Sequence, residues 1–160
     1  MQKQLFGLMA WLAICFIASA LGATASINAE SFYNELTQPS WAPPAWLFGP
    51  VWTILYIMMA ISAWLVWRTV GFRANSAALT LFLAQLALNT LWSWLFFAWQ
   101  YGSLSFLDII VLWVLILLTI IHFWRVSSLA GLLLIPYWLW VSFAMVLNFT
   151  IWQLNPELLS

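Results

Sequence analysis

The segment PSWAPPAWLFGPVWTILYIMMAISAWLVWR, from Pro39 to Arg68, decides the fold of this chain. A proline-rich polar turn leads into a long apolar run that carries no charge before Arg68. A helix that crosses a membrane needs roughly 20 apolar residues, so the segment predicts a transmembrane helix. Its face through Trp52, Tyr56, Met59 and Ala63 follows helical spacing. Because an indole has a large apolar body and one N–H donor, an aromatic face of this kind suits a membrane belt or a ligand pocket.

The composition extends this prediction to the whole chain. Of 160 residues, 66% are hydrophobic and only 5% are charged, whereas a soluble domain has about 25% charged residues. The sequence therefore predicts an all-α integral membrane protein, a single domain over residues 1–160. We expect a bundle of five transmembrane helices, at about 5–26, 44–67, 76–99, 103–124 and 128–153.

The few charges predict the orientation of this bundle. With five spans, one side holds every Lys and Arg: Lys3, Arg68, Arg73 and Arg125. The other side holds Glu30, Glu35 and Glu157, with Asp108 about a turn into the fourth helix. The positive-inside rule then places the N-terminus in the cytoplasm and the first loop and C-terminus outside. A bacterial inner membrane is favoured, because outer membranes usually contain barrels.

The N-terminal 26 residues resemble a signal peptide in part, through Lys3 and the stretch Ala23-Thr24-Ala25. Their apolar run is longer than a typical signal core, so we expect the segment to remain as the first helix. Its small residues Ala18, Gly22 and Ser26 recur every four positions, which permits close helix packing, either within the chain or in a dimer. The lone Cys15 is expected to be a small buried hydrophobe.

Two further regions could contribute to a ligand site. Residues 27–43 form a long polar loop, which is either a lid over a pocket or an ordinary connection. Gln85, Asn89, Trp92 and Phe96 share one face of the third helix. Amides within a bilayer usually face protein, where they join helices or contact a ligand. His122 has no partner at metal-ligand spacing, so no metal site is predicted.

Several function classes find no support in the sequence. It contains no phosphate-binding glycine loop, no Ser/His/Asp or Cys/His set, and no basic patch for nucleic acid. No ionisable residue lies near the middle of a predicted span, which argues against an ion-driven pump. An aromatic, apolar site with a few uncharged polar groups remains, and such a site suits a flat hydrophobic ligand.

Four motifs give the chain a family resemblance: PSWAPPAW at 39–46, GPVWTILY at 49–56, ALNTLWSWLFF at 87–97 and PYWLWVSFAMVLNFTIWQLNP at 136–156. With these motifs it resembles the TspO/MBR family, the tryptophan-rich sensory proteins related to the mitochondrial translocator protein (peripheral benzodiazepine receptor). The resemblance implies a five-helix bundle in the lipid bilayer, usually a homodimer. It also implies a pocket under the first loop that binds porphyrins, sterols and synthetic ligands, without a required cofactor.

The resemblance also implies site residues. Matched by motif, the ligand-binding positions are Trp41, Pro43, Trp46, Trp52, Tyr56, Asn89, Trp92, Trp140, Ala144 and Leu147. Protoporphyrin IX or haem is the implied ligand. Some relatives degrade protoporphyrin IX in light, and the resemblance assigns the photochemical role to Trp52 and Trp140. This reaction needs no acid–base pair, so no firm catalytic residue is expected.

Two departures from the family pattern affect these expectations. The sterol-recognition pattern requires a tyrosine followed by a cation, whereas this chain has Phe149 and Thr150 at the tyrosine position and Gln153 at the cation position. The predicted outer side also offers no Lys or Arg to porphyrin propionates. Indole N–H groups, amides or loop backbone must hold these carboxylates, or they stay in water. A facilitative transporter of porphyrin intermediates, or a structural or regulatory partner anchored in lipid by its tryptophans, remains the alternative.

Overall fold

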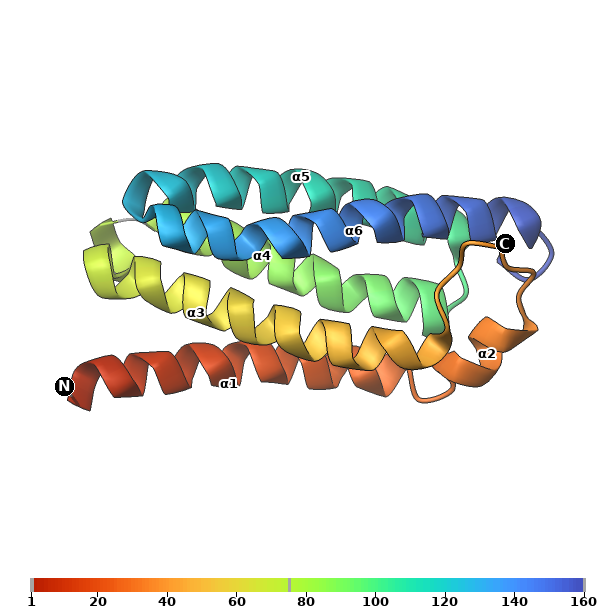
Figure 1. Cartoon of the computed structure of the whole chain (residues 1–160), viewed down its shortest axis with the longest axis horizontal. Coiled ribbons are helices and arrows are strands. Elements are labelled where there is room, and N and C mark those ends of the chain that lie inside the picture. The colour runs from red at the N-terminus through yellow and green to blue at the C-terminus, as the bar shows by residue number, and fades with distance from the viewer. Residues whose placement is uncertain (1, 75, 160) are drawn as a thin grey trace.

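The protein is a bundle of long helices that run side by side (Figure 1). The computed structural model describes residues 2–74 and 76–159, without the side chains of residues 70, 72–74 and 76. The long helices in this part of the chain are α1 (Gln2–Ala25), α3 (Phe48–Ala74), α4 (Ser76–Ser93), α5 (Gly102–Val126) and α6 (Ser128–Leu154). Five segments are long and apolar enough to cross a membrane: Gln2–Ala25, Ala45–Thr69, Ala77–Ala98, Gly102–Val126 and Ser128–Leu154. The predicted all-α fold with five spans is therefore confirmed.

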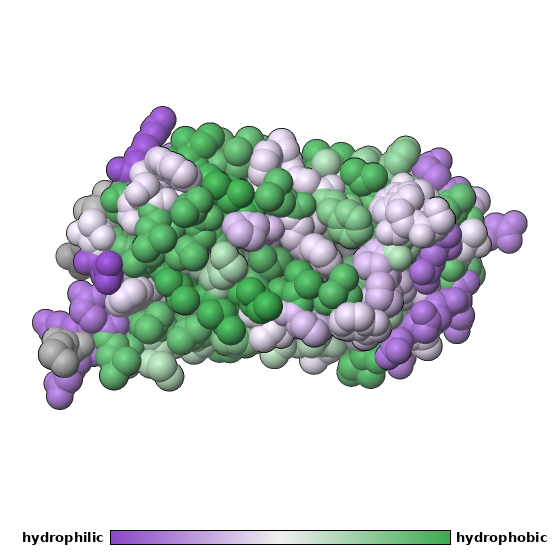
Figure 2. Space-filling model, in the orientation of Figure 1, coloured by the Kyte–Doolittle hydropathy of each residue, from purple (hydrophilic) through white to green (hydrophobic). Residues whose placement is uncertain are grey.

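The outer surface has the polarity expected of a bilayer protein. On the face seen in Figure 2, apolar side chains predominate in the middle of the bundle and the most polar groups gather at its two ends. Large hydrophobic side chains such as Ile54, Leu107 and Leu139 are more than half exposed. Such a surface would be costly in water but is stable against lipid tails.

The buried faces of the helices follow the predicted periodicity. On α3, Tyr56, Met59 and Ala63 are all buried in the main hydrophobic core. Helix α3 extends past the predicted end at 67 as far as Gly71, where a positive φ of 68° interrupts the helical conformation. Only glycine adopts this conformation without strain, so Gly71 sets the end of the regular helix.

Small residues on α1 pack within the chain. The Ala18 carbonyl accepts a hydrogen bond from Thr90 Oγ1 of α4 at 3.3 Å, and a Cβ added to Gly22 would lie 3.3 Å from Ser93 Oγ. The neighbouring Leu21 carbonyl accepts from Trp94 Nε1 at 3.2 Å. This geometry assigns the face of Ala18 and Gly22 to intrachain packing. Cys15 is buried and free, as expected.

Three short helices complete the fold. They are α2 (Ala29–Glu35) in the first loop, the 3₁₀ helix η1 (Ala45–Leu47) before α3, and the π-helix η2 (Trp94–Ala98) after α4. In η2 the N–H of Trp99 donates to the carbonyl of Trp94 at 2.8 Å. This wider turn continues the third span to the predicted end near residue 99, and π-turns often occur at functional sites.

Candidate functional site

Aromatic side chains from the first loop, α3 and α6 form a continuous row at the end of the bundle that carries α2. We define the aromatic row by neighbouring rings in the order Trp41, Phe143, Trp140, Phe48 and Tyr33. The ring centroids of successive pairs lie 5.9, 5.5, 6.0 and 5.5 Å apart. These spacings are typical of attractive aromatic pairs. The row therefore connects the loop to two membrane-spanning helices.

Trp52 lies between two tyrosines. Its ring centroid is 5.7 Å from that of Tyr56 on the same helix and 6.1 Å from that of Tyr137 on α6. Both tyrosines are buried. The face predicted from the spacing of Trp52 and Tyr56 thus contacts α6 in the interior of the bundle.

A buried polar chain joins α3, α4 and α6 beside Trp52. Tyr56 Oη donates to Asn89 Oδ1 at 2.7 Å, Asn89 Nδ2 donates to Tyr137 Oη at 2.9 Å, and Tyr137 Oη donates to Gln85 Oε1 at 2.8 Å. An unpaired polar group is costly inside a membrane, so these hydrogen bonds stabilise the contact between the three helices. The two predicted amides therefore join helices, and ligand contact by Asn89 stays a prediction.

Trp92 belongs to a second polar contact. Its ring stacks on Phe96 with centroids 5.2 Å apart, and its Nε1 donates to Asn148 Oδ1 at 3.4 Å. Asn148 Nδ2 in turn donates to Ser105 Oγ of α5 at 3.2 Å. The indole N–H of Trp92 is therefore already occupied.

The indole N–H of Trp140 is different, because it is buried and has no hydrogen-bond partner within residues 2–74 and 76–159. Leaving such a donor unpaired costs about 1–3 kcal/mol. Trp140 is also the central member of the aromatic row, between Phe48 and Phe143. In the same part of the chain Gln85 Nε2, Asp108 Oδ2 and Trp138 Nε1 are also buried without a partner.

The first loop forms a structured cover over this end of the bundle. Phe32, Tyr33 and Leu36 are buried in one hydrophobic cluster with Phe96 of η2 and Leu147 of α6. Tyr33 Oη donates to the carbonyl of Pro43 at 3.1 Å, which closes the loop on itself. Burial raises the pKa of the Tyr33 phenol, so it remains a hydrogen-bond donor at neutral pH.

Pro43, Trp92 and Leu147 lie at this cover, whereas Tyr56 and Asn89 lie in the buried polar chain. Trp41 is 47% exposed at the edge of the cover, and Ala144 is half-buried against the core. Trp46, in η1, is 70% exposed and stands apart from the aromatic row. Four aromatic residues of the site were not predicted as ligand positions: Tyr33, Phe48, Tyr137 and Phe143. Tyr137 and Phe143 each lie three residues from Trp140, and this spacing places them near its face of α6.

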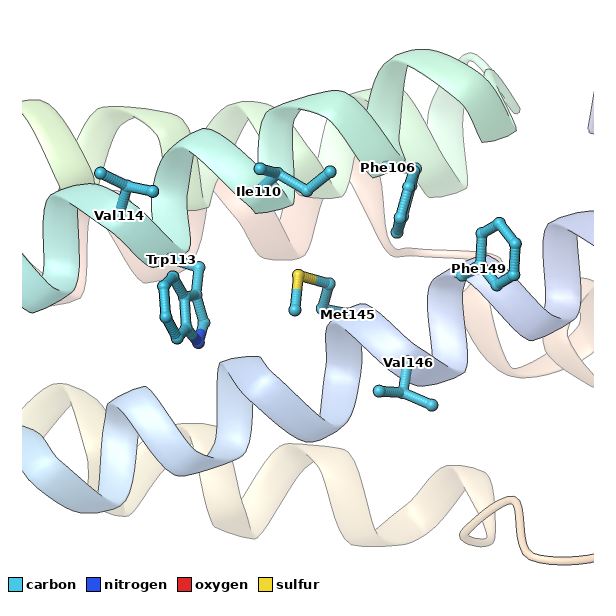
Figure 3. A pocket seen from close by; sticks show the side chains of 7 residues that line it. All are labelled: Phe106, Ile110, Trp113, Val114, Met145, Val146 and Phe149. Carbon is cyan, nitrogen blue, oxygen red and sulfur yellow. The ribbon is translucent and has the colours of Figure 1, made fainter.

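Two grooves open on the surface elsewhere. One, of about 470 Å³, lies between α5 and α6 and is lined by Phe106, Ile110, Trp113, Val114, Met145, Val146 and Phe149 (Figure 3). The other, of about 380 Å³, is lined by Gln2, Lys3, Phe6 and Trp67. Neither groove contains a predicted ligand residue. No group of three or more potential metal ligands occurs in the described part of the chain.

Comparison with known proteins agrees with the motifs and the fold. A model of the TspO/MBR family matches residues 10–153. The chain is 46% identical over 159 residues to the tryptophan-rich protein TspO of Chlorobaculum tepidum, an alignment covering 98% of this chain and 100% of the relative. It is 41% identical to the protein CrtK of Rhodobacter capsulatus, covering 90% and 92%. It is 34% identical to the translocator protein of Homo sapiens, covering 88% and 83%. Because these matches span most of the chain, the protein belongs to the TspO/MBR family.

Proposed function

We propose that this membrane protein binds porphyrin-type tetrapyrroles in the aromatic region beneath its first loop. The binding would serve sensing, scavenging or light-dependent degradation of the porphyrin. The observation that carries the proposal is the buried, unpartnered N–H of Trp140 at the centre of the aromatic row. A site of aromatic side chains with one free donor suits a flat ligand that bears a hydrogen-bond acceptor.

Entry of such a ligand requires the cover to move. The rings of Trp41 and Phe143 are in contact, with centroids 5.9 Å apart, and Trp41 is the more exposed of the two. A porphyrin would separate these rings and stack against Trp140. Its propionates would remain in water at the loop, because Lys3, Arg68 and Arg125 belong to segments at the other end of the bundle. In light, Trp52 and Trp140 would be the oxidisable partners of an excited porphyrin and dioxygen.

The charge distribution supports a location for this activity. Lys3 and Arg125 lie at the end of the bundle opposite to α2, whose first turn carries Glu30. By the positive-inside rule, the N-terminus would be cytoplasmic and the cover would face outward from an inner membrane. We expect a homodimer, formed through a face other than that of Ala18 and Gly22.

A titration of the purified protein in nanodiscs with protoporphyrin IX tests the proposal. Tryptophan fluorescence is followed in the dark, and the porphyrin absorption spectrum is then recorded during illumination. Quenching should saturate in the wild type, and the double variant Trp52→Phe/Trp140→Phe should lose most of it. Trp99→Phe is the matched control, because Trp99 is exposed at the same end of the bundle.

The possible outcomes distinguish ligand binding from lipid anchoring, degradation and transport. Quenching that never saturates would mean that the tryptophans mainly anchor the protein in lipid. Quenching that the double variant retains as fully as Trp99→Phe would mean the same. Loss of porphyrin bands beyond that in empty nanodiscs would add degradation to binding. The name of the human relative refers to translocation. Net porphyrin uptake into vesicles, dependent on Trp140, would therefore favour a facilitative transporter over a receptor.

A further inference from the structure

The end of the bundle that carries the N-terminus has a positive charge with no acidic counterpart. Lys3 lies in the first turn of α1, Arg68 near the end of α3 and Arg125 in the last turn of α5. The acidic residues lie at or toward the other end, in α2, after α6 and in the first turns of α5: Glu30, Glu35, Glu157 and Asp108. The helices separate the two sets by most of a bilayer thickness, so the charge at this basic end must be balanced from outside the chain.

A crevice at the basic end combines one of these cations with apolar rings. It has a volume of about 380 Å³ and is lined by Gln2, Lys3 and Phe6 of α1 and by Trp67 of α3. The Phe6 side chain is 76% exposed although it is large and apolar. One rim is therefore polar and cationic, and the remaining wall is aromatic.

The packing of α1 against α3 fixes this crevice. A Cβ on Gly7 would lie 2.2 Å from Cζ3 of Trp67, so only a glycine lets the indole seat at this depth. One turn earlier on α3, Trp64 Nε1 donates to the carbonyl of Gln4 at 3.0 Å. The guanidinium of Arg68 lies 4.5 Å from the centroid of the Trp64 ring, which holds a second cation close to the same helix pair. Close packing of α1 against α3 therefore fixes the indole wall of the crevice, and the exposed side chains of Gln2, Lys3 and Phe6 line the rest.

We propose that an anionic phospholipid of the bilayer occupies this crevice. Its phosphate would bind the Lys3 ammonium and the Gln2 amide, and the upper part of an acyl chain would lie along Phe6 and Trp67. Basic pockets between transmembrane helices are suited to anionic headgroups. Aromatic rings at this depth lie beside the start of the hydrocarbon region. A zwitterionic lipid would bring its own cation to Lys3 and gain less.

Stepwise lipid addition to the detergent-purified full chain, followed by native mass spectrometry, tests this site. Apparent dissociation constants are measured for phosphatidylglycerol and phosphatidylcholine with identical acyl chains. One near-surface cation contributes roughly fivefold to anionic lipid binding, so the wild type should prefer phosphatidylglycerol by about that factor. Lys3→Gln should abolish the preference. Phe6→Ala should weaken the binding of both lipids to the same extent, because it removes apolar contact and leaves the charge of Lys3 in place.

Arg125→Gln is the matched control, since it removes one exposed cation from the same end but outside the crevice. It should retain the preference for phosphatidylglycerol. Equal affinity of the wild type for both lipids would overturn the proposal. An equal loss of the phosphatidylglycerol preference in Lys3→Gln and Arg125→Gln would also overturn it, because the preference would then come from the overall positive charge of this end. Displacement of phosphatidylglycerol by inorganic phosphate at equal concentration would identify a free-anion site and also overturn it.

Discussion

The side-chain amide of Asn155, just after α6, pairs with both backbone polar groups of Thr37 in the first loop. Asn155 Oδ1 accepts from the N–H of Thr37 at 2.8 Å, and Asn155 Nδ2 donates to the carbonyl of Thr37 at 3.0 Å. The amide thus replaces a backbone partner for a loop segment that lies in neither a helix nor a sheet. It joins residues 118 positions apart in the chain and fastens the cover to the end of the bundle.

Replacement of Asn155 by alanine should loosen the cover. The substitution removes both bonds to Thr37, each of which contributes about 0.5–1.5 kcal/mol. Amide hydrogen exchange in residues 31–38 should become roughly tenfold faster or more, while exchange in the middle of the spans stays unchanged. Asn34→Ala is the control, because Asn34 is exposed in the same loop. Equal protection in both variants would show that the buried side chains of the cover hold it without Asn155.

Trp140→Phe should weaken porphyrin binding by roughly tenfold, the value of one hydrogen bond of about 1.4 kcal/mol. The control is Trp138→Phe, which also removes a buried indole N–H that has no partner in the described part of the chain. Trp138 packs instead against Trp113 of α5, with ring centroids 4.9 Å apart. Dissociation constants for protoporphyrin IX should separate the two variants. Similar affinities would mean that the Trp140 donor does not meet the ligand.

Tyr137→Phe should destabilise the bundle more than Tyr56→Phe does. The first change leaves both Asn89 Nδ2 and Gln85 Oε1 without their partner, whereas the second leaves only Asn89 Oδ1. A buried unpaired group costs about 1–3 kcal/mol. Thermal unfolding in detergent should therefore rank the wild type above Tyr56→Phe and Tyr56→Phe above Tyr137→Phe. The reverse ranking would contradict the observed direction of this hydrogen-bond chain.

The docking of the cover should weaken in alkaline solution. Burial raises the pKa of Tyr33 in the folded protein above its unfolded value, which is about 10. The folded state therefore holds this proton more tightly, and the contribution to stability is present below about pH 10 and is lost as the pH rises further. Limited proteolysis of the loop at pH 8–11 should accelerate above pH 10. Tyr33→Phe should remove the part of this acceleration that comes from ionisation of the phenol. An unchanged pH profile in that variant would show that Tyr33 does not cause the acceleration.

Within the site, the sequence predicted those residues whose placement follows from helical spacing. Trp52 and Tyr56 share a helical face. Tyr56 is a member of the buried polar chain, and the Trp52 ring lies beside it. The helix α2 was not predicted, because its seven residues are too few to show a clear periodicity. Its buried rings pack on other elements, Phe32 on Phe96 of η2 and Tyr33 on Phe48 of α3. Tertiary packing therefore made a helix from a segment that the sequence presents as a polar loop.

The sequence by itself determined the membrane class, the five spans, the separation of charge and the family. The membrane class and the spans depend on the hydrophobicity of continuous segments, because each such segment is stable in a bilayer as a helix before it packs against the others. Only the tertiary structure decided that Phe48 and Phe143 flank Trp140, that Trp46 faces outward, and that Asn155 holds Thr37. The physical reason is that aromatic packing and side-chain hydrogen bonds act over a few ångströms. Their partners, far apart in the chain, meet only when the helices have packed.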